Sequence, residues 1–135
     1  MGLAERRAVE RFRNDDYPAW KARIDEVAGF DVAVEVVWDE LAAAEYADSY
    51  SSFFPMVYFQ PMVDALAAIT IDDMGRSALR EGLRKVVVRN TEQFSSTSGF
   101  SFEGGILTID HKPYTNVDYG ADRASGLQKL LEAGL

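Results

Sequence analysis

Apolar and polar residues alternate most regularly in the segment FDVAVEVVW, residues 30–38. Every second residue in this segment is large and apolar: Phe30, Val32, Val34, Val36 and Trp38. The residues between them include Asp31 and Glu35, and a period of two places alternate side chains on opposite faces of a strand. The pattern therefore predicts a strand over 30–38, with one face on the core and the other partly in water.

In the first 29 residues the apolar positions follow the spacing of a helix. In the segment YPAWKARIDEVAGF the apolar residues recur every three or four positions, which predicts an amphipathic helix. Asp15 or Asp16 suits its N-cap, Pro18 suits its first turn, and Gly29 suits the position after its end. The charged segment before it is also helical, so the chain forms either two helices that meet near residue 15 or one bent helix.

Residues 39–71 also have a helical pattern, which two prolines interrupt. Asp39 is a suitable N-cap for a helix that continues to about residue 52. Pro55 and Pro61 have no N–H to donate, which predicts a break near residue 53 and a second helix that ends near Ile69. The second helix, PMVYFQPMVDALAAI, is apolar almost all round, as is typical of a helix buried in the core or beneath a partner.

The rest of the chain adds a helix, three strands and a last helix. Asp72 begins the helix DDMGRSALREGLRK, and KVVVRNT reads as a short central strand because it is mostly apolar. FSFEGGILTID predicts a hairpin that turns at Gly104 and Gly105, and residues 117–133 predict the last helix. Helices and strands are segregated, which favours a single α+β domain over 1–135, with helices on one face of a mainly antiparallel sheet of three to five strands.

Composition narrows the function classes. The 135 residues fit one domain and contain no cysteine, which excludes disulfides, thiolate metal sites and thiol nucleophiles. The net charge of −8 repels phosphate backbones and anionic lipids, so we expect neither nucleic-acid nor membrane binding. Glycine-rich nucleotide motifs are missing, so no cofactor is expected, and the N-terminal segment does not resemble a signal peptide, which favours a cytoplasmic location.

The chain's one histidine, His111, has two acidic residues near it in sequence, Asp110 and Asp118. These three side chains are the best candidates for a metal site. However, Asp110 and His111 are adjacent at the end of a strand, so their side chains point to opposite faces. The preferred interpretation is structural: a turn at Pro113, then a capping box formed by Thr115 and Asp118. We therefore predict no metal site.

Arg76, Arg80 and Arg84 recur every four residues on the outer side of the helix that begins near Asp72. Three guanidinium groups in a row could clamp an anion or contact an acidic partner. The alternative is a solvated helix face whose arginines pair with some of the surplus carboxylates, and this interpretation is favoured.

Aromatic residues are dense between positions 38 and 59, and they suggest a ligand pocket. Tyrosine has an apolar ring and one polar group, which suits the wall of a pocket. The candidate site combines three tyrosines with two polar residues: Tyr46, Tyr50, Tyr58, Gln60 and Asp64. The alternative is a core layer with Gln60 and Asp64 at its edge.

We expect a small soluble domain without catalytic residues, which binds a protein partner or self-associates. An inhibitor or immunity-type role against a basic partner is one version of this hypothesis, suggested by the acidic charge and the small size. The second hypothesis is a small-molecule-binding or enzymatic domain that uses the pocket around residues 46–64, with Asp64 as an acid or base.

Overall fold

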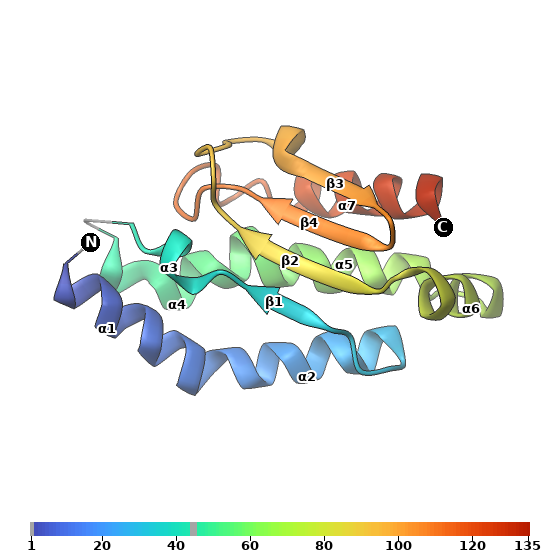
Figure 1. The fold of residues 1–135 in the computed structure, drawn as a ribbon, viewed down its shortest axis with the longest axis horizontal. Coiled ribbons are helices and arrows are strands. Elements are labelled where there is room, and N and C mark those ends of the chain that lie inside the picture. Colours follow the sequence, from blue (N-terminus) through green and yellow to red (C-terminus); the bar gives the residue numbers. More distant parts are fainter. Residues whose placement is uncertain (1, 44–45) are drawn as a thin grey trace.

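The computed structural model describes residues 2–43 and 46–135. One sheet contains β1 (Val34–Val36), β2 (Lys85–Arg89), β4 (Ile106–Asp110) and β3 (Phe100–Glu103), in that spatial order (Figure 1). The helices and helical turns are α1 (Leu3–Arg11), η1 (Phe12–Asp16), α2 (Tyr17–Ala28), α3 (Trp38–Leu41), η2 (Ala47–Ser49), α4 (Tyr50–Phe54), η3 (Pro55–Phe59), α5 (Gln60–Ile69), α6 (Asp73–Gly82), η4 (Thr97–Gly99) and α7 (Gly120–Gly134).

The four-stranded sheet confirms the predicted α+β class, but the prediction of a mainly antiparallel sheet is wrong. β2 is parallel to both β1 and β4, and β3 alone is antiparallel, to β4. Between β1 and β2 the chain passes through α3, α4, α5 and α6, and this crossover returns it to the end of the sheet where β1 began. The loop 90–99 then carries β3 to the outer edge, which leaves the position beside β2 for β4.

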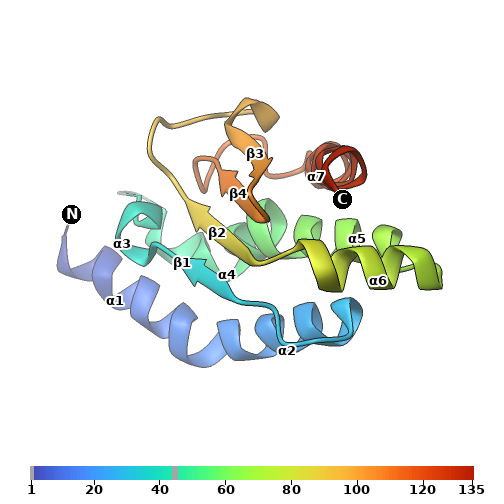
Figure 2. The same cartoon turned by 45° about the vertical axis from the view of Figure 1, so that its right-hand side comes forward.

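One face of the sheet packs on the helices, and the other carries charged side chains. Figure 1 looks onto the charged face, with α5 and α7 behind the sheet, and the turned view in Figure 2 shows the same order of layers. Val88 and Ile109 are register partners on the helix side, and both are fully buried. On the charged side Lys85 donates to Glu35 at 2.7 Å.

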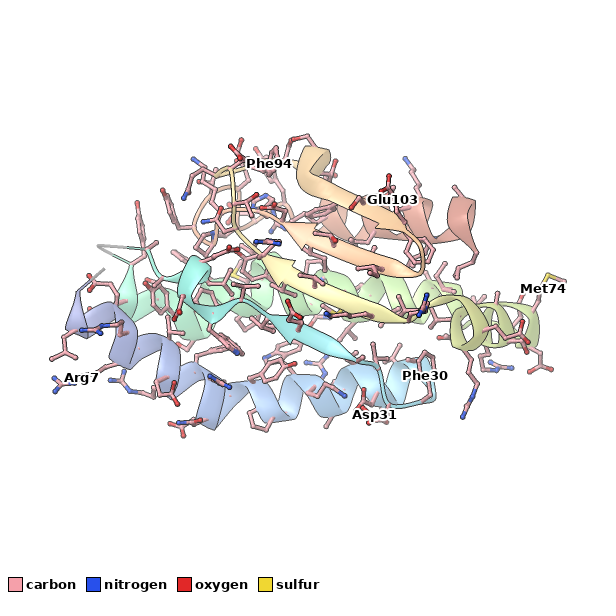
Figure 3. The ribbon with its side chains drawn as sticks, viewed as in Figure 1. Arg7, Phe30, Asp31, Met74, Phe94 and Glu103 are labelled. Carbon is pink, nitrogen blue, oxygen red and sulfur yellow. The ribbon has the colours of Figure 1, made fainter. Side chains whose placement is uncertain are left out.

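The first strand is shorter than the alternating pattern predicts. Only residues 34–36 pair with β2, and Trp38 already begins α3. The pattern extends further because the link from α2 also places alternate side chains inward and outward. Phe30 and Asp31 lie in this link, at the end of α2 (Figure 3).

Residues 3–28 form one bent helix, as the second of the two alternatives predicted. Between α1 and α2 the five residues of η1 form a π turn, in which the N–H of Tyr17 donates to the carbonyl of Phe12. The helix therefore continues past Pro18, and the predicted cap at Asp15 or Asp16 is wrong. Gly29 ends the helix as predicted, in the left-handed conformation at φ 85°.

The predicted helix over 39–52 and the predicted break near residue 53 are both wrong. α3 ends at Leu41, and residues 44 and 45 lie outside the described residues. From Tyr50 the chain stays helical to Ile69, because the π turn η3 connects α4 to α5. There the N–H of Gln60 donates to the carbonyl of Pro55, and Pro61 follows at once.

The helix from α4 to α5 forms the centre of the core. The side chains of Phe54, Tyr58, Met62 and Leu66 are fully buried. The segment Ala47–Ile69 is long and apolar enough to span a membrane, a property that buried core helices share.

Several local predictions are confirmed. β2 lies inside the sheet, and the hairpin turns at Gly104 and Gly105 with φ values of 60° and 80°. The carboxylate of Asp72 accepts from the N–H of Gly75 at 2.8 Å and so caps α6. The last helix begins at Gly120 rather than at residue 117.

Candidate functional site

A groove lies on the surface where three segments meet: residues 15–20, residues 51–64 and residues 117–121. It consists of two adjoining hollows of about 570 Å³ and about 390 Å³. Trp20, Pro55 and Met56 line both hollows and so lie at the centre. We call it the α2–α5 groove.

The centre of the α2–α5 groove is apolar and partly open to solvent. The side chain of Met56 is 40% exposed. The ring of Trp20 stacks near Phe59, with 6.4 Å between ring centroids, and the guanidinium of Arg23 lies 4.3 Å from the Trp20 centroid. Arg23 also donates to the side-chain carbonyl of Gln60 at 3.4 Å, which joins α2 to α5 at the edge of the groove.

Carboxylates line both ends of the groove. Asp15 and Asp16 line the larger hollow, and Asp64 and Asp118 line the smaller one. Within residues 2–43 and 46–135, none of these four takes part in an ion pair. Asp64 accepts one hydrogen bond, from the amide of Gln60 at 2.7 Å. The groove therefore combines an apolar centre with carboxylates at each end, and the positive charges of Arg23 and Arg123 lie near its smaller hollow.

A buried arginine holds one wall of the groove in place. Arg123, in the first turn of α7, is only 2% exposed. Its guanidinium donates to the carbonyls of Asn116 at 2.6 Å, Val117 at 2.9 Å and Met56 at 3.1 Å. Burial lowers the pKa of Arg123, but a guanidinium stays charged in proteins. Arg123 thus ties the loop before α7 to η3, and no sequence pattern marked it.

The structure does not bring the five residues of the predicted tyrosine pocket together. Gln60 and Asp64 line the groove, but Tyr50 and Tyr58 are buried in the core. The hydroxyl of Tyr50 donates to the carbonyl of Ala43 at 2.8 Å. Gln60 follows Tyr58 by two residues, which is about 200° around a helix, so the two side chains point in nearly opposite directions.

Tyr46 and Tyr58, the other two tyrosines of the predicted pocket, make different contacts. Tyr46 is half-buried and stacks on Tyr114, with 4.5 Å between ring centroids. The hydroxyl of Tyr58 donates to the carbonyl of His111 at 2.6 Å, and burial raises the pKa of Tyr58 well above its usual value. Both are placed to support the fold.

The three arginines of the predicted ridge do not form one row, because α6 ends at Gly82, before Arg84. Arg76 donates to the carbonyl of Thr70 at 3.0 Å and pairs with Asp73. Arg80 donates to the carbonyl of Gly29 at 3.3 Å. Two of the three therefore hold neighbouring segments of the fold.

His111 and the two acidic residues near it in sequence do not form a cluster. His111 is fully buried, and its Nδ1 donates to the carbonyl of Lys112 at 2.6 Å. The carboxylate of Asp110 accepts from the N–H and the hydroxyl of Thr91, whereas Asp118 lies at the groove. Among the described residues no three His, Cys, Asp or Glu side chains lie close enough to hold a metal ion.

Burial lowers the pKa of the His111 imidazole. The carbonyls of Lys112 and Ser95 oppose this effect, and the positive charges of Arg123 and Lys112 add to it. The Nε2 atom is buried and has no hydrogen-bond partner in the described part of the chain.

The predicted capping box at Thr115 and Asp118 is wrong, because α7 begins later, at Gly120.

Comparisons with protein-family models, with curated proteins and with solved structures gave no match to this chain. The geometry and the charge of the α2–α5 groove are therefore the basis for a proposal about function.

Proposed function

We propose that this chain is a non-catalytic binding domain whose α2–α5 groove docks a basic protein partner. The observation that carries the proposal is the arrangement along the groove: the exposed Met56 lies between Asp15 and Asp16 at one end and Asp64 and Asp118 at the other. Lysine or arginine side chains of the partner would contact the carboxylates, while an apolar side chain would cover Met56.

The charge of the chain supports a cationic partner. A net charge of −8 attracts a basic protein over distances of the order of the Debye length, about 8 Å at physiological salt, and speeds up the encounter. The same charge repels a second copy of this chain. Groove-to-groove self-association is therefore the less favourable version of the proposal.

The apolar centre supports a protein rather than a simple cation as the ligand. Tryptophan is enriched among the residues that dominate binding energy, and methionine adapts its shape to an incoming side chain. Trp20 and Met56 would form the central contact. The carboxylates at the ends would contribute mainly to orientation and to the association rate.

A small-molecule site is the second candidate. The smaller hollow, about 390 Å³, has the volume of an ordinary ligand pocket, and Gln60 and Asp64 line it. A small ligand held there would not need Asp15 or Asp16, which lie in the other hollow. Substitutions at the two ends therefore distinguish a small ligand from a protein segment.

Selection of displayed random peptides on the purified domain tests the proposal. The expected peptides carry lysine or arginine on both sides of an apolar residue and bind Met56→Glu at least ten-fold more weakly. The matched control is Met74→Glu, since Met74 is 82% exposed in α6, at the far end of the molecule from Arg7 (Figure 3). Selected peptides without basic residues, or equal binding to both variants, would refute the proposal.

A charge-matched pair of variants tests the role of the carboxylates. Asp64→Lys changes the net charge by +2 at the groove, and Glu103→Lys makes the same change at the tip of the hairpin (Figure 3). The selected peptides should bind Asp64→Lys several-fold more weakly at low salt and less so at high salt, because salt screens exposed charges. An equal loss in both variants would show that only the overall charge matters.

A further inference from the structure

We infer that the segment bound in the α2–α5 groove is a basic amphipathic helix of about three turns. The inference rests on the proposed docking function and adds the conformation and the charge spacing of the partner. It follows from the shape of the groove walls, from the state of their backbone groups and from the separation of the two acidic ends.

Both long walls of the groove are helices that run side by side in the same direction (Figures 1 and 2). The pairs of contacts along them show this direction. Asp16 shares a hollow with Ser52, and seven residues further along Arg23 reaches Gln60. A depression between two helices matches the ridge of side chains on a third helix, which packs at 8–10 Å from its neighbours.

The backbone of the walls favours a helical occupant over an extended one. α2, η3 and α5 are helical, and the Met56 carbonyl of η3 already accepts from Arg123, so these walls offer no strand edge to which an extended segment could add. An extended segment would leave its backbone groups facing an apolar surface around Met56, and each unpaired group costs about 1–3 kcal/mol. A helix pairs these groups internally.

The length of the groove sets the spacing of the partner's charges. Ser52 and Asp16 line the same hollow at one end, and Asp64 lines the hollow at the other. Twelve helical residues separate Ser52 from Asp64, which is about 18 Å at 1.5 Å per residue. A bound helix would therefore carry its two cationic groups about eleven or twelve residues apart, with apolar residues between them facing Trp20 and Met56.

An extended or polyproline segment would need a different spacing. At roughly 3.1–3.4 Å per residue, about five or six residues span the same 18 Å. Helical and extended occupants therefore predict different positions for the basic residues, and synthetic peptides can separate them.

Three fluorescein-labelled peptides of about sixteen residues test the inference by fluorescence anisotropy. The first is alanine-based, with leucines at the centre and lysine pairs about eleven residues apart (about 17 Å as a helix). The second replaces two central alanines of the first by proline, which breaks a helix. The third has the composition of the first with lysine pairs about five residues apart. Each is measured on the wild-type chain, Met56→Glu and Met74→Glu.

The first peptide should bind at least ten-fold more tightly than the other two, gain helical circular dichroism on binding, and lose affinity for Met56→Glu alone. If Met56→Glu weakens a second peptide that binds as tightly as the first, the helical conformation is refuted and the docking function stands. If it weakens a third peptide that binds as tightly as the first, the charge spacing is refuted and the docking function stands. If Met56→Glu weakens none of the three, both the inference and the docking function are refuted.

Trp20 provides a separate readout of the site. The chain has two tryptophans, so Trp38→Phe leaves Trp20 as the one indole. Binding of the first peptide should shift the emission of Trp20 to shorter wavelength, since the peptide removes the half-buried ring from water. An unchanged emission at saturating peptide would place the binding outside the groove and refute the inference.

Discussion

Replacing Arg123 by methionine should destabilise the fold strongly, although no carboxylate pairs with this residue among the described ion pairs. The substitution keeps most of the side-chain volume and removes the three hydrogen bonds to backbone carbonyls. Hydrogen bonds from a charged donor contribute about 1.5–3 kcal/mol each. Removing the cost of a buried charge offsets part of this loss, so we expect a net decrease of about 3 kcal/mol in the free energy of unfolding.

Urea unfolding followed by circular dichroism measures the effect, and thermal unfolding should show a decrease in Tm of roughly 10 °C. The control is Arg84→Met, at an exposed arginine, which should change the free energy of unfolding by no more than about 0.5 kcal/mol. Arg123→Lys should fall between the two, because an ammonium group keeps the charge but cannot reach three carbonyls as the planar guanidinium does.

A decrease of less than about 1 kcal/mol for Arg123→Met would refute the reasoning, because it would show that water replaces the guanidinium at these carbonyls at little cost. Hydrogen exchange gives an independent check. The backbone near Asn116 and Val117 should exchange faster in the variant, since Arg123 ties this wall of the groove to Met56.

Three further predictions concern the histidine, the buried phenol and the hairpin turn. Burial lowers the pKa of His111, so the unfolded chain binds the proton more tightly than the folded chain. The free energy of unfolding should therefore be highest above about pH 6.5 and should decrease as the pH falls below that value. In urea unfolding, His111→Gln should lack this decrease and keep only the decrease that the carboxylates cause. Tyr58→Phe removes the hydrogen bond to the His111 carbonyl and should lower the free energy of unfolding in urea by about 1–2 kcal/mol. The control Tyr119→Phe, at an exposed ring, should leave this free energy almost unchanged. Equal effects of the two substitutions would contradict the hydrogen bond of Tyr58. Gly104→Ala and Gly105→Ala both place alanine at positive φ, but only at Gly105 would the new Cβ meet other atoms, with Arg84 Cγ at 2.6 Å. The Tm of Gly105→Ala should therefore be lower than that of Gly104→Ala. A lower Tm for Gly104→Ala would argue against close packing of Arg84 on the turn.

Features that depend on a few neighbouring residues could be predicted from the sequence. The hairpin at Gly104 and Gly105, the cap at Asp72 and the helix end at Gly29 each follow from the conformational preference of one or two residues. The apolar run of β2 likewise predicted a strand inside the sheet.

Features that depend on the path of the chain could not be predicted. Nothing local in KVVVRNT tells whether its neighbours are parallel or antiparallel, because that depends on how the helices of residues 37–84 return the chain. Segregation of helices and strands suggested antiparallel pairing, but one long helical crossover between β1 and β2 produces parallel strands just as well.

The candidate site was predictable only in part. The segment around Met56 is apolar on all sides, and this pattern suggested a helix beneath a partner or in the core. Gln60 and Asp64 of the predicted pocket line the groove, but the three tyrosines were grouped with them only because they are near in sequence. No sequence pattern indicated the role of Arg123, because its partners are backbone carbonyls. One of them, the carbonyl of Met56, lies 67 residues away in sequence.

The two π turns have a consequence for counting along the helices. Phe12 and Ile24 are both buried and are twelve residues apart, as are Phe54 and Leu66. On an uninterrupted α-helix twelve residues would place two side chains about 120° apart, whereas eleven residues complete about three turns. Each π turn absorbs one residue and so returns the two buried side chains of each pair to the same face of the helix. Deleting one residue inside η1 would therefore keep Phe12 and Ile24 on the core, but the same deletion within α2 before Ile24 would rotate Ile24 by about 100° away from it.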